Sequence, residues 1–289
     1  MARDLGSNQD QGIENLLSSL PGDGQLLSLL LNTHQPVGSQ LVLLMHRTLI
    51  LLIYIALCLM FVLPGLILWS VLTGSPDFMY RMAMKAVRGA NRLCGIAVRI
   101  EGLENIPPGV CIFAANHVSN VDPLAFVPSI PRRVSILIKR ELFRIPILSI
   151  AMRLAGFIPV DRADRRDAAA SADAAVHHLH KGLSFAIFAE GTRSPDGRLR
   201  RFKRGAFVIA MQARVPVVPV SLVGTQKVMR KGERAIHPGE VIVRFGPAVD
   251  TSRYTTDRRA ELQARVESLV AAGLPPDQRP LPRAPSTSS

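Results

Sequence analysis

The sequence predicts an α/β domain with a layered, largely parallel or mixed sheet flanked by helices, preceded by an N-terminal membrane helix or hairpin. Short apolar runs rich in β-forming residues alternate with helical patterns between residues 96 and 273, and this alternation is typical of layered α/β domains. Ahead of them, residues 48–72 form an uncharged apolar run that exceeds the roughly 20 residues needed to cross a hydrocarbon core. With 48% hydrophobic residues and a mean hydropathy of +0.22, the chain of 289 residues is not wholly disordered.

Composition divides the chain into four segments. Residues 1–40 are polar and are expected to be a disordered extension, and residues 41–95 contain the membrane anchor and an amphipathic linker. Residues 96–273 form the globular domain. The last segment, 274–289, is rich in Pro and Ser; it has too little apolar surface to offset the entropy of ordering, so we expect a disordered tail.

Pro64-Gly65 interrupts the apolar run, so the run forms either one kinked span or a helical hairpin that enters one leaflet, and both remain open. Arg3 is the only Lys or Arg among residues 1–40, whereas the stretch 78–94 is rich in Lys and Arg. This asymmetry predicts that the globular domain faces the cytoplasm. The stretch 78–94 is also amphipathic, and it either lies on an anionic membrane face or packs as an ordinary surface helix.

The elements of the globular domain follow in order along the chain. Strands are predicted at 97–101, 110–115, 134–138, 157–160, 184–189, 216–222 and 240–245. Helices are predicted at 121–128, 146–154, 167–181, 205–213 and 255–272. Gly182 and Gly273 directly follow two of these helices and suit a left-handed helix end. Ligands of α/β sheets bind at the carboxyl ends of strands, so the loops after Ala115 and Ala189 are the expected site.

The charge balance predicts an anionic partner. Lys and Arg number 35 against 22 Asp and Glu, a net charge of +13, and the pI is near 10.7. Nucleic acid, lipid headgroups and phosphorylated substrates all fit this charge. The cysteines Cys58, Cys94 and Cys111 match no metal-binding or disulfide spacing, so we expect a domain that faces a reducing compartment.

The first motif, NHVSNVDP at 116–123, follows the strand that ends at Ala115. On one helix His117 and Asp122 would point roughly 140° apart, so they meet only if His117 precedes the helix. Such a turn would form a catalytic pair, in which the carboxylate orients the imidazole while the histidine takes a proton from a hydroxyl. Ser119-x-x-Asp122 also fits a helix-capping box with His117 as a loop residue, and both interpretations remain open.

The second motif, EGTRSPDG at 190–197, follows the strand predicted at 184–189. SPDG is typical of a tight turn, and Arg193 beside the backbone amides of a glycine-containing turn suits a bidentate contact with phosphate. Residues 193–204 carry six basic residues and one acidic residue. A solvated basic surface loop fits this pattern about equally well.

Together these residues resemble the glycerolipid acyltransferase family, which includes the bacterial 1-acylglycerol-3-phosphate acyltransferases. Four ordered motifs between residues 95 and 245 carry the resemblance. They are H-x4-D at 117–122, GFIPVDR at 156–162, EGTR at 190–193 and VPVVPV at 215–220. Lys139 matches the basic position that precedes the second motif in the family.

The resemblance implies a membrane-bound O-acyltransferase of phospholipid biosynthesis. It implies that His117, oriented by Asp122, is the general base that removes the proton from a lipid hydroxyl, and that no covalent acyl-enzyme is required. Lysophosphatidic acid is the expected acceptor and phosphatidic acid the product. Acyl-CoA or acyl carrier protein is the expected donor and partner, alongside membrane lipids. The resemblance calls for no metal and no redox cofactor.

The resemblance also implies a set of substrate-binding residues: Lys139, Arg162, Glu190, Gly191, Thr192 and Arg193. Arg193 and Lys139, together with Arg162, would hold the phosphate of the acceptor. Glu190 would shape the pocket or order the nearby bases by pairing with them.

Other functions compete with this one. Glycerol-3-phosphate, another lysophospholipid or a lyso-aminolipid are alternative acceptors. A non-catalytic membrane module that binds anionic lipid would explain the charge and the anchor but leaves His117 and Asp122 without a role. Nucleic-acid binding is disfavoured, because the basic cluster at 193–204 contains Phe202 as its only stacking aromatic residue.

Overall fold

The computed structural model describes residues 49–161, 164–230, 232–233 and 235–281, without the side chains of Arg165 and Ala168. The polar extension predicted for residues 1–40 lies outside the described residues, as do the last residues of the predicted tail, 282–289.

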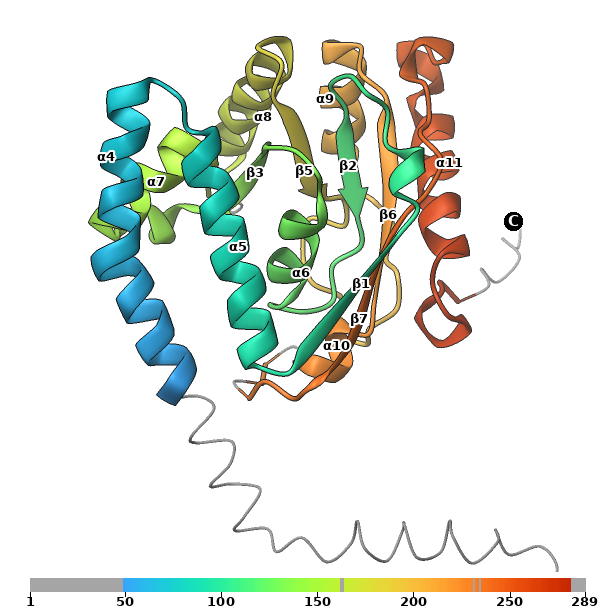
Figure 1. Ribbon diagram of the computed structural model, residues 1–289. Helices are drawn as coiled ribbons and strands as arrows, with labels where there is room; N and C mark the ends of the chain where they lie inside the picture. The colour runs from blue at the N-terminus through green and yellow to red at the C-terminus, as the bar shows by residue number, and fades with distance from the viewer. Residues whose placement is uncertain (1–48, 162–163, 231, 234, 282–289) are drawn as a thin grey trace, which may run out of the picture. The chain divides into compact units, whose positions relative to one another are not determined.

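Seven strands of the described chain form one mixed sheet (Figure 1). They are β1 (Ile96–Glu101), β2 (Ile112–Ala115), β3 (Val134–Lys139), β4 (Ile158–Val160), β5 (Ser184–Phe188), β6 (Val217–Val223) and β7 (Gly239–Phe245). Their order in the sheet is β1-β7-β6-β2-β5-β3-β4. Strands β6, β2, β5, β3 and β4 all run parallel, whereas β7 is antiparallel to β6 and parallel to β1. The predicted fold class is confirmed.

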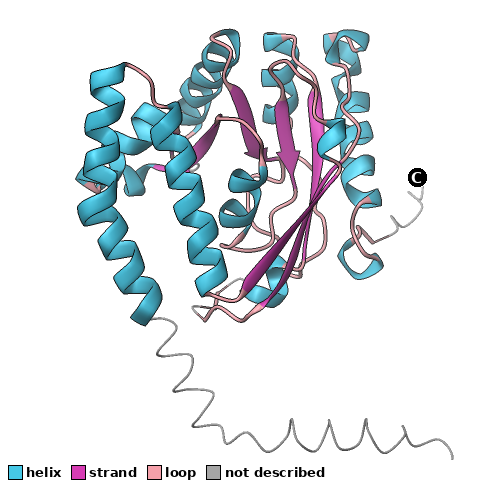
Figure 2. Cartoon of the chain, in the orientation of Figure 1, coloured by secondary structure: helices cyan, strands magenta, loops and turns pink. Residues whose placement is uncertain are grey.

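Helices cover both faces of this sheet (Figure 2). The described helices of the body are α5 (Asp77–Leu93), α6 (Asp122–Ser129), α7 (Pro146–Ala155), α8 (Arg165–His180), α9 (Gly205–Ala213), α10 (Thr225–Val228) and α11 (Arg259–Ala272). α5, α6 and α7 contribute to one hydrophobic cluster, and α8, α9 and α11 contribute to a second one. The domain therefore has three layers.

The central strand β2 shows how its sequence builds both clusters. All four of its residues are fully buried. Side chains alternate between the faces of a strand, so Phe113 and Ala115 join the cluster on the α6 side, while Ile112 and Ala114 join the cluster on the α9 side. A strand buried on both faces explains why the sequence reads as an unbroken apolar run.

The apolar run forms one continuous helix, Leu49–Thr73, and among the described residues it is the one helix long and apolar enough to cross a membrane by length and composition. It contains a π-helical turn, η1 (Cys58–Val62), and continues as α4 (Leu63–Thr73), in which Pro64 is the second residue. Proline lacks an N–H group and crowds the preceding turn, so a widened turn accommodates it. A kinked span thus fits the structure, and a hairpin within this run does not.

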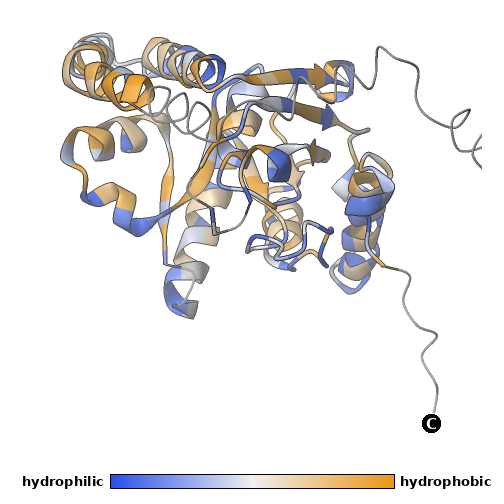
Figure 3. Cartoon of the chain, turned by 90° about the horizontal axis from the view of Figure 1, so that it is seen from below, coloured by the Kyte–Doolittle hydropathy of each residue, from blue (hydrophilic) through white to orange (hydrophobic). Residues whose placement is uncertain are grey.

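The two N-terminal helices pack against each other. α4 contacts α5 and α7, and the Tyr54 hydroxyl donates a hydrogen bond of 2.9 Å to the Ala86 carbonyl. α5 buries Met79, Tyr80 and Asn91, as an ordinary surface helix does. Seen from below, the hydrophobic colouring gathers on the side where the 49–73 helix lies (Figure 3). Its exposed apolar side chains include those of Phe61 and Leu72.

Two details of the C-terminal region differ from the sequence predictions. Gly182 has a positive φ of 85°, as predicted, but Gly273 has φ of −78° and is helical. A Cβ atom at Gly273 would overlap the Ser221 side chain, so a glycine is needed there for close packing. The predicted tail begins later than residue 274, because Leu274 and Gln278 are buried and the Gln278 carbonyl accepts a 2.8 Å hydrogen bond from the Leu199 N–H.

Candidate active site

The two loops predicted to hold the site lie side by side at the carboxyl ends of neighbouring strands. β2 pairs in parallel with β5, with Ala115 opposite Phe188. On the other side of β2, the Asn116 side chain donates to the Leu222 carbonyl at 3.1 Å and accepts from the Leu222 N–H at 2.7 Å. Asn116 therefore ties the start of the loop at residues 116–121 to β6.

His117 and Asp122 meet in this loop. His117 Nδ1 lies 2.7 Å from Asp122 Oδ2, and the same oxygen accepts the backbone N–H groups of Val118 at 2.7 Å and Ser119 at 2.8 Å. Asp122 is fully buried and His117 is 8% exposed. With Nδ1 facing a carboxylate, the proton of the neutral imidazole belongs on Nδ1, and Nε2 keeps the lone pair that can accept a proton.

The two interpretations of this motif are therefore compatible. α6 begins at Asp122, and the Ser119 N–H bond to its carboxylate is one half of a capping box. The Ser119 hydroxyl accepts from the Val121 N–H at 3.1 Å and donates to the Met229 carbonyl at 2.7 Å. The cap at the helix start also holds the carboxylate that His117 contacts.

Phe188 covers one face of the His117 ring. The two rings stack with centroids 4.1 Å apart and an angle of 20° between their planes, and Phe126 of α6 contacts Phe188 edge-on at 5.8 Å. Sequence reasoning missed Phe188. The available signal was its position, because Phe188 lies at the carboxyl end of β5, the edge of the sheet where ligands are expected.

Glu190 braces the two loops against each other. Its Oε1 accepts the His117 N–H at 2.7 Å, and its Oε2 accepts the Arg200 N–H at 3.2 Å. Burial, reinforced by the Asp122 charge, raises the pKa of Glu190 to about 7, against the opposing effect of the two N–H groups. In the described part of the chain Glu190 forms no ion pair with a basic side chain, so it orders this region through backbone groups.

Gly191, Thr192 and Arg193, the rest of the EGTR motif, follow Glu190 along the chain. Gly191 has φ of +71°, and a Cβ atom there would lie 2.7 Å from Lys203 Cδ. Thr192 is exposed and Arg193 is half-buried. The next residue, Ser194, donates its N–H to the His117 carbonyl at 2.8 Å, so the chain brings Arg193 close to the loop that carries His117. Lys203, which lies over Gly191, is a residue that sequence reasoning did not single out.

The structure does not bring Lys139 into this cluster. Lys139 ends β3, which is separated from β2 by β5. Its ammonium group lies 3.1 Å from Glu141 Oε1, and its side chain is 74% exposed. Arg162 lies outside the described residues. In the chain as described, no group of three or more His, Cys, Asp or Glu side chains could hold a metal ion.

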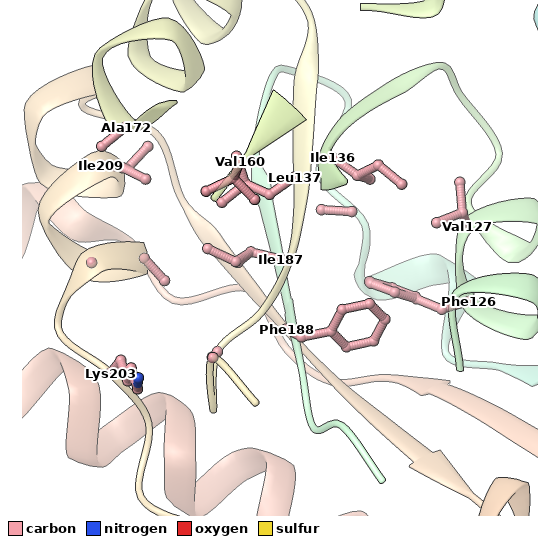
Figure 4. Close-up of a pocket in the computed structure, with 15 residues that line it drawn as sticks. Phe126, Val127, Ile136, Leu137, Val160, Ala172, Ile187, Phe188, Lys203 and Ile209 are labelled. Atoms are coloured by element: carbon pink, nitrogen blue, oxygen red, sulfur yellow. The ribbon is translucent and has the colours of Figure 1, made fainter. Parts of the chain in front are cut away.

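An apolar cavity of about 250 Å³ adjoins the site. Phe188, which stacks on His117, is one of its lining residues, and Lys203 is the only charged one (Figure 4). The other labelled side chains around it are aliphatic or aromatic: Phe126, Val127, Ile136, Leu137, Val160, Ala172, Ile187 and Ile209. A proton-accepting histidine, a basic loop and an apolar cavity are thus neighbours.

Comparisons with known proteins agree with this arrangement. The family profile described as Acyltransferase matches residues 97–223. The chain is 33% identical over 190 residues to the 1-acyl-sn-glycerol-3-phosphate acyltransferase of Limnanthes alba, covering 65% of this chain and 67% of that protein. It is 31% identical over 183 residues to the enzyme of the same name from Borreliella burgdorferi, covering 63% of this chain and 73% of that protein.

A solved structure shows the same fold. The crystal structure of the 1-acyl-sn-glycerophosphate (LPA) acyltransferase PlsC from Thermotoga maritima superimposes with a TM-score of 0.71 at 28% identity, covering 80% of this chain and 95% of that one. Sequence and fold thus agree with the four motifs that frame the His117 site. The chain belongs to the 1-acyl-sn-glycerol-3-phosphate acyltransferase family and is an O-acyltransferase.

Proposed function

We propose that this acyltransferase moves an acyl chain from acyl-CoA or acyl-ACP to the free hydroxyl of lysophosphatidic acid, forming phosphatidic acid for phospholipid biosynthesis. The observation that carries the proposal is the buried contact of 2.7 Å between His117 and Asp122 at the carboxyl edge of the sheet. The names of the relatives from Limnanthes, Borreliella and Thermotoga support this choice of acceptor.

His117 acts as the general base. Nε2 takes the proton of the lipid hydroxyl as the hydroxyl oxygen attacks the thioester carbonyl carbon. The tetrahedral oxyanion then collapses, the carbon–sulfur bond breaks, and the leaving thiolate takes the proton from Nε2. The Asp122 carboxylate stabilises the imidazolium that exists between these steps. Glu190 is a positioning residue, because it holds the His117 backbone rather than a substrate atom.

The acceptor phosphate is held by Arg193 and Lys139, with Arg162 as a third candidate. A guanidinium forms paired, charge-assisted hydrogen bonds with phosphate oxygens. Among the described residues, the ion pair that Lys139 forms is an exposed one with Glu141, and exposed ion pairs add little to stability. Lys139 can therefore leave Glu141 for a phosphate at little cost in free energy.

The acyl chain occupies the apolar cavity. Burial of each methylene group contributes about 0.8 kcal/mol, and a cavity of about 250 Å³ lined by Phe188 and aliphatic side chains favours such burial. Because Phe188 also stacks on His117, a chain in this cavity would bring its carbonyl carbon towards the general base.

The helix 49–73 anchors the protein in the membrane, with the catalytic domain on the cytoplasmic side. Its exposed apolar side chains would be covered by lipid, and the acceptor and product are themselves membrane lipids. Carbonate extraction of membranes from cells that express the full chain tests the anchor: retention in the pellet is expected, and release into the supernatant would contradict it. Labelling of exposed lysines in sealed, oriented vesicles tests the orientation.

The catalytic proposal is tested with the purified full chain and a thioester-release assay. His117→Ala should abolish turnover, and the matched variant His180→Ala, at an exposed position of α8, should not. Wild-type turnover by a folded His117→Ala protein would rule out the general-base role.

The acceptor is tested with a panel of lysophosphatidic acid, glycerol-3-phosphate, lysophosphatidylcholine and a lyso-aminolipid. Arg193→Lys keeps the charge but loses the planar fork, so it should lower kcat/KM for lysophosphatidic acid with much less effect on donor saturation. A wild-type preference for an acceptor without phosphate would leave the acyltransferase class intact but would refute the phosphate contact.

A further inference from the structure

A second cavity, of about 420 Å³, lies between the turn at residues 194–197 and α10, which follows β6. We call it the α10 cavity. It differs in character from the apolar one, because Ser194, Asp196, Lys227 and Arg230 all contribute to its lining. No step of the proposed mechanism uses it.

Both walls of the α10 cavity are hydrogen-bonded to the catalytic loop. On one wall, the Ser194 N–H donates to the His117 carbonyl at 2.8 Å. On the other wall, the Ser119 hydroxyl donates to the carbonyl of Met229, the residue before Arg230, at 2.7 Å. Val118, the residue next to His117, lines the space between them. The α10 cavity therefore lies beside the loop that carries His117.

The two walls are also fixed to each other. Gly197 has φ of +80°, and the Gln226 side chain of α10 occupies the space where a Cβ atom of residue 197 would lie. A larger residue at 197 would push the turn away from α10. The α10 cavity is thus formed by close packing of the turn on the short helix.

The positive charges of the α10 cavity are available to a ligand. Lys227 and Arg230 are exposed, and within the described chain neither forms an ion pair. The one acid of the lining, Asp196, uses its Oδ1 to accept the Ser194 hydroxyl at 2.8 Å and the Arg198 N–H at 3.1 Å. Asp196 therefore bonds within its own turn, and the two bases are left for an anion.

We propose that the α10 cavity binds the phosphate groups of a substrate through Lys227 and Arg230. The inference rests on the proposed acyl transfer, in which both substrates carry phosphate. The acceptor phosphate already has Arg193 and Lys139, so the phosphates of the thioester donor are the expected occupants. An ammonium and a guanidinium beside a polar cavity provide the charge-assisted hydrogen bonds that phosphate oxygens favour.

The kinetic test uses the full chain and the double variant Lys227→Gln/Arg230→Gln. The matched control is Lys181→Gln/Arg265→Gln, which removes the same charge from two exposed positions that line neither cavity. We expect the KM for acyl-CoA, at saturating lysophosphatidic acid, to rise by about tenfold or more in the double variant, as for the loss of charged hydrogen bonds, and kcat to change little.

The reciprocal experiment separates the two sources of phosphate. If the KM for lysophosphatidic acid rises instead, at saturating acyl-CoA, the α10 cavity is still a phosphate site, but it binds the phosphate of the acceptor and not those of the donor. If neither KM rises above that of the control variant, the proposal is wrong.

A binding measurement separates this inference from the proposed function. Calorimetry of the full chain in detergent uses coenzyme A and glycerol-3-phosphate as probes. If the wild type binds a probe and the double variant loses that binding, the site stands even where no acyl transfer is found. If the wild type transfers acyl chains but binds both probes no better than the double variant does, the proposed phosphate site in the α10 cavity is refuted. The proposed acyltransferase function is then unaffected.

Discussion

Replacement of Asp122 by Asn should lower kcat by about a thousandfold without unfolding the protein. Asp122 Oδ2 accepts hydrogen bonds from three groups: the Nδ1–H of His117 and the backbone N–H groups of Val118 and Ser119. An amide oxygen at the same place can accept all three, so the loop geometry and the imidazole tautomer are retained. The negative charge beside the imidazolium is lost.

The magnitude follows from the geometry of the pair. Nδ1 and Oδ2 are in hydrogen-bond contact at 2.7 Å. For unit charges about 4 Å apart, an effective dielectric constant of about 20 gives an interaction of about 4 kcal/mol. Each 1.36 kcal/mol added to the barrier lowers the rate by about a factor of ten. The loss of about 4 kcal/mol therefore lowers kcat by about a thousandfold.

The same substitution should lower stability by about 1–3 kcal/mol, because Asp122 Oδ1 is buried without a hydrogen-bond partner among the described residues, and the asparagine places an unpaired N–H₂ group there. Thermal unfolding measures this effect separately from activity. A lower Tm with a single cooperative transition would show that the variant is folded.

The assay is thioester release at saturating donor and acceptor. Ser119→Ala is the matched control in the same loop, because it removes the hydroxyl's bonds to the Met229 carbonyl and the Val121 N–H but keeps the Asp122 charge. Its kcat should fall by less than about tenfold, because neither of the two lost hydrogen bonds involves His117 or Asp122. If folded Asp122→Asn protein keeps more than a tenth of the wild-type kcat, the charge of Asp122 does not stabilise the rate-limiting state, and the reasoning is refuted.

Three further predictions concern the residues around this pair. Because the pKa of Glu190 is raised from its ordinary 4.5 to about 7, its carboxyl stabilises the fold fully below pH 4.5 and loses that contribution as the pH rises through 7. The free energy of unfolding of the wild type relative to Glu190→Gln should thus fall by about 3 kcal/mol between pH 4.5 and 8 in urea titrations; a difference that is constant or rises with pH would contradict this. Gly191→Ala should lower Tm more than Gly182→Ala, because both positions have positive φ but only Gly191 has a neighbour, Lys203, within contact of a new Cβ; equal shifts in Tm would argue against the contact. Phe188→Leu should lower kcat by about three- to tenfold, because a stacked ring pair contributes about 0.5–1.5 kcal/mol, and unchanged kcat would show that the stack does not orient His117.

Much of this protein follows from local sequence. The period-2 and helical patterns predicted every strand of the described sheet to within two residues at each end, because local periodicity reports which face of an element is buried. The apolar run predicted the helix 49–73. The rule that ligands bind at the carboxyl ends of parallel strands selected the loops after Ala115 and Ala189, and the structure brings those loops together.

Contacts between distant residues were decided only by the tertiary structure. The sequence left a capping box and a catalytic pair as alternatives at Asp122, and in the fold one carboxylate oxygen contacts both His117 Nδ1 and the Ser119 N–H. The partners of Glu190 are backbone groups of His117 and Arg200, and no spacing rule predicts them. Gly273 departed from the helix-end rule because its constraint comes from Ser221 on another element. The contacts at Asp122 are local, but they depend on the turn that precedes α6. At Glu190 and Gly273 the deciding atoms belong to segments far apart in the chain, and the order and register of the strands bring them within bonding distance.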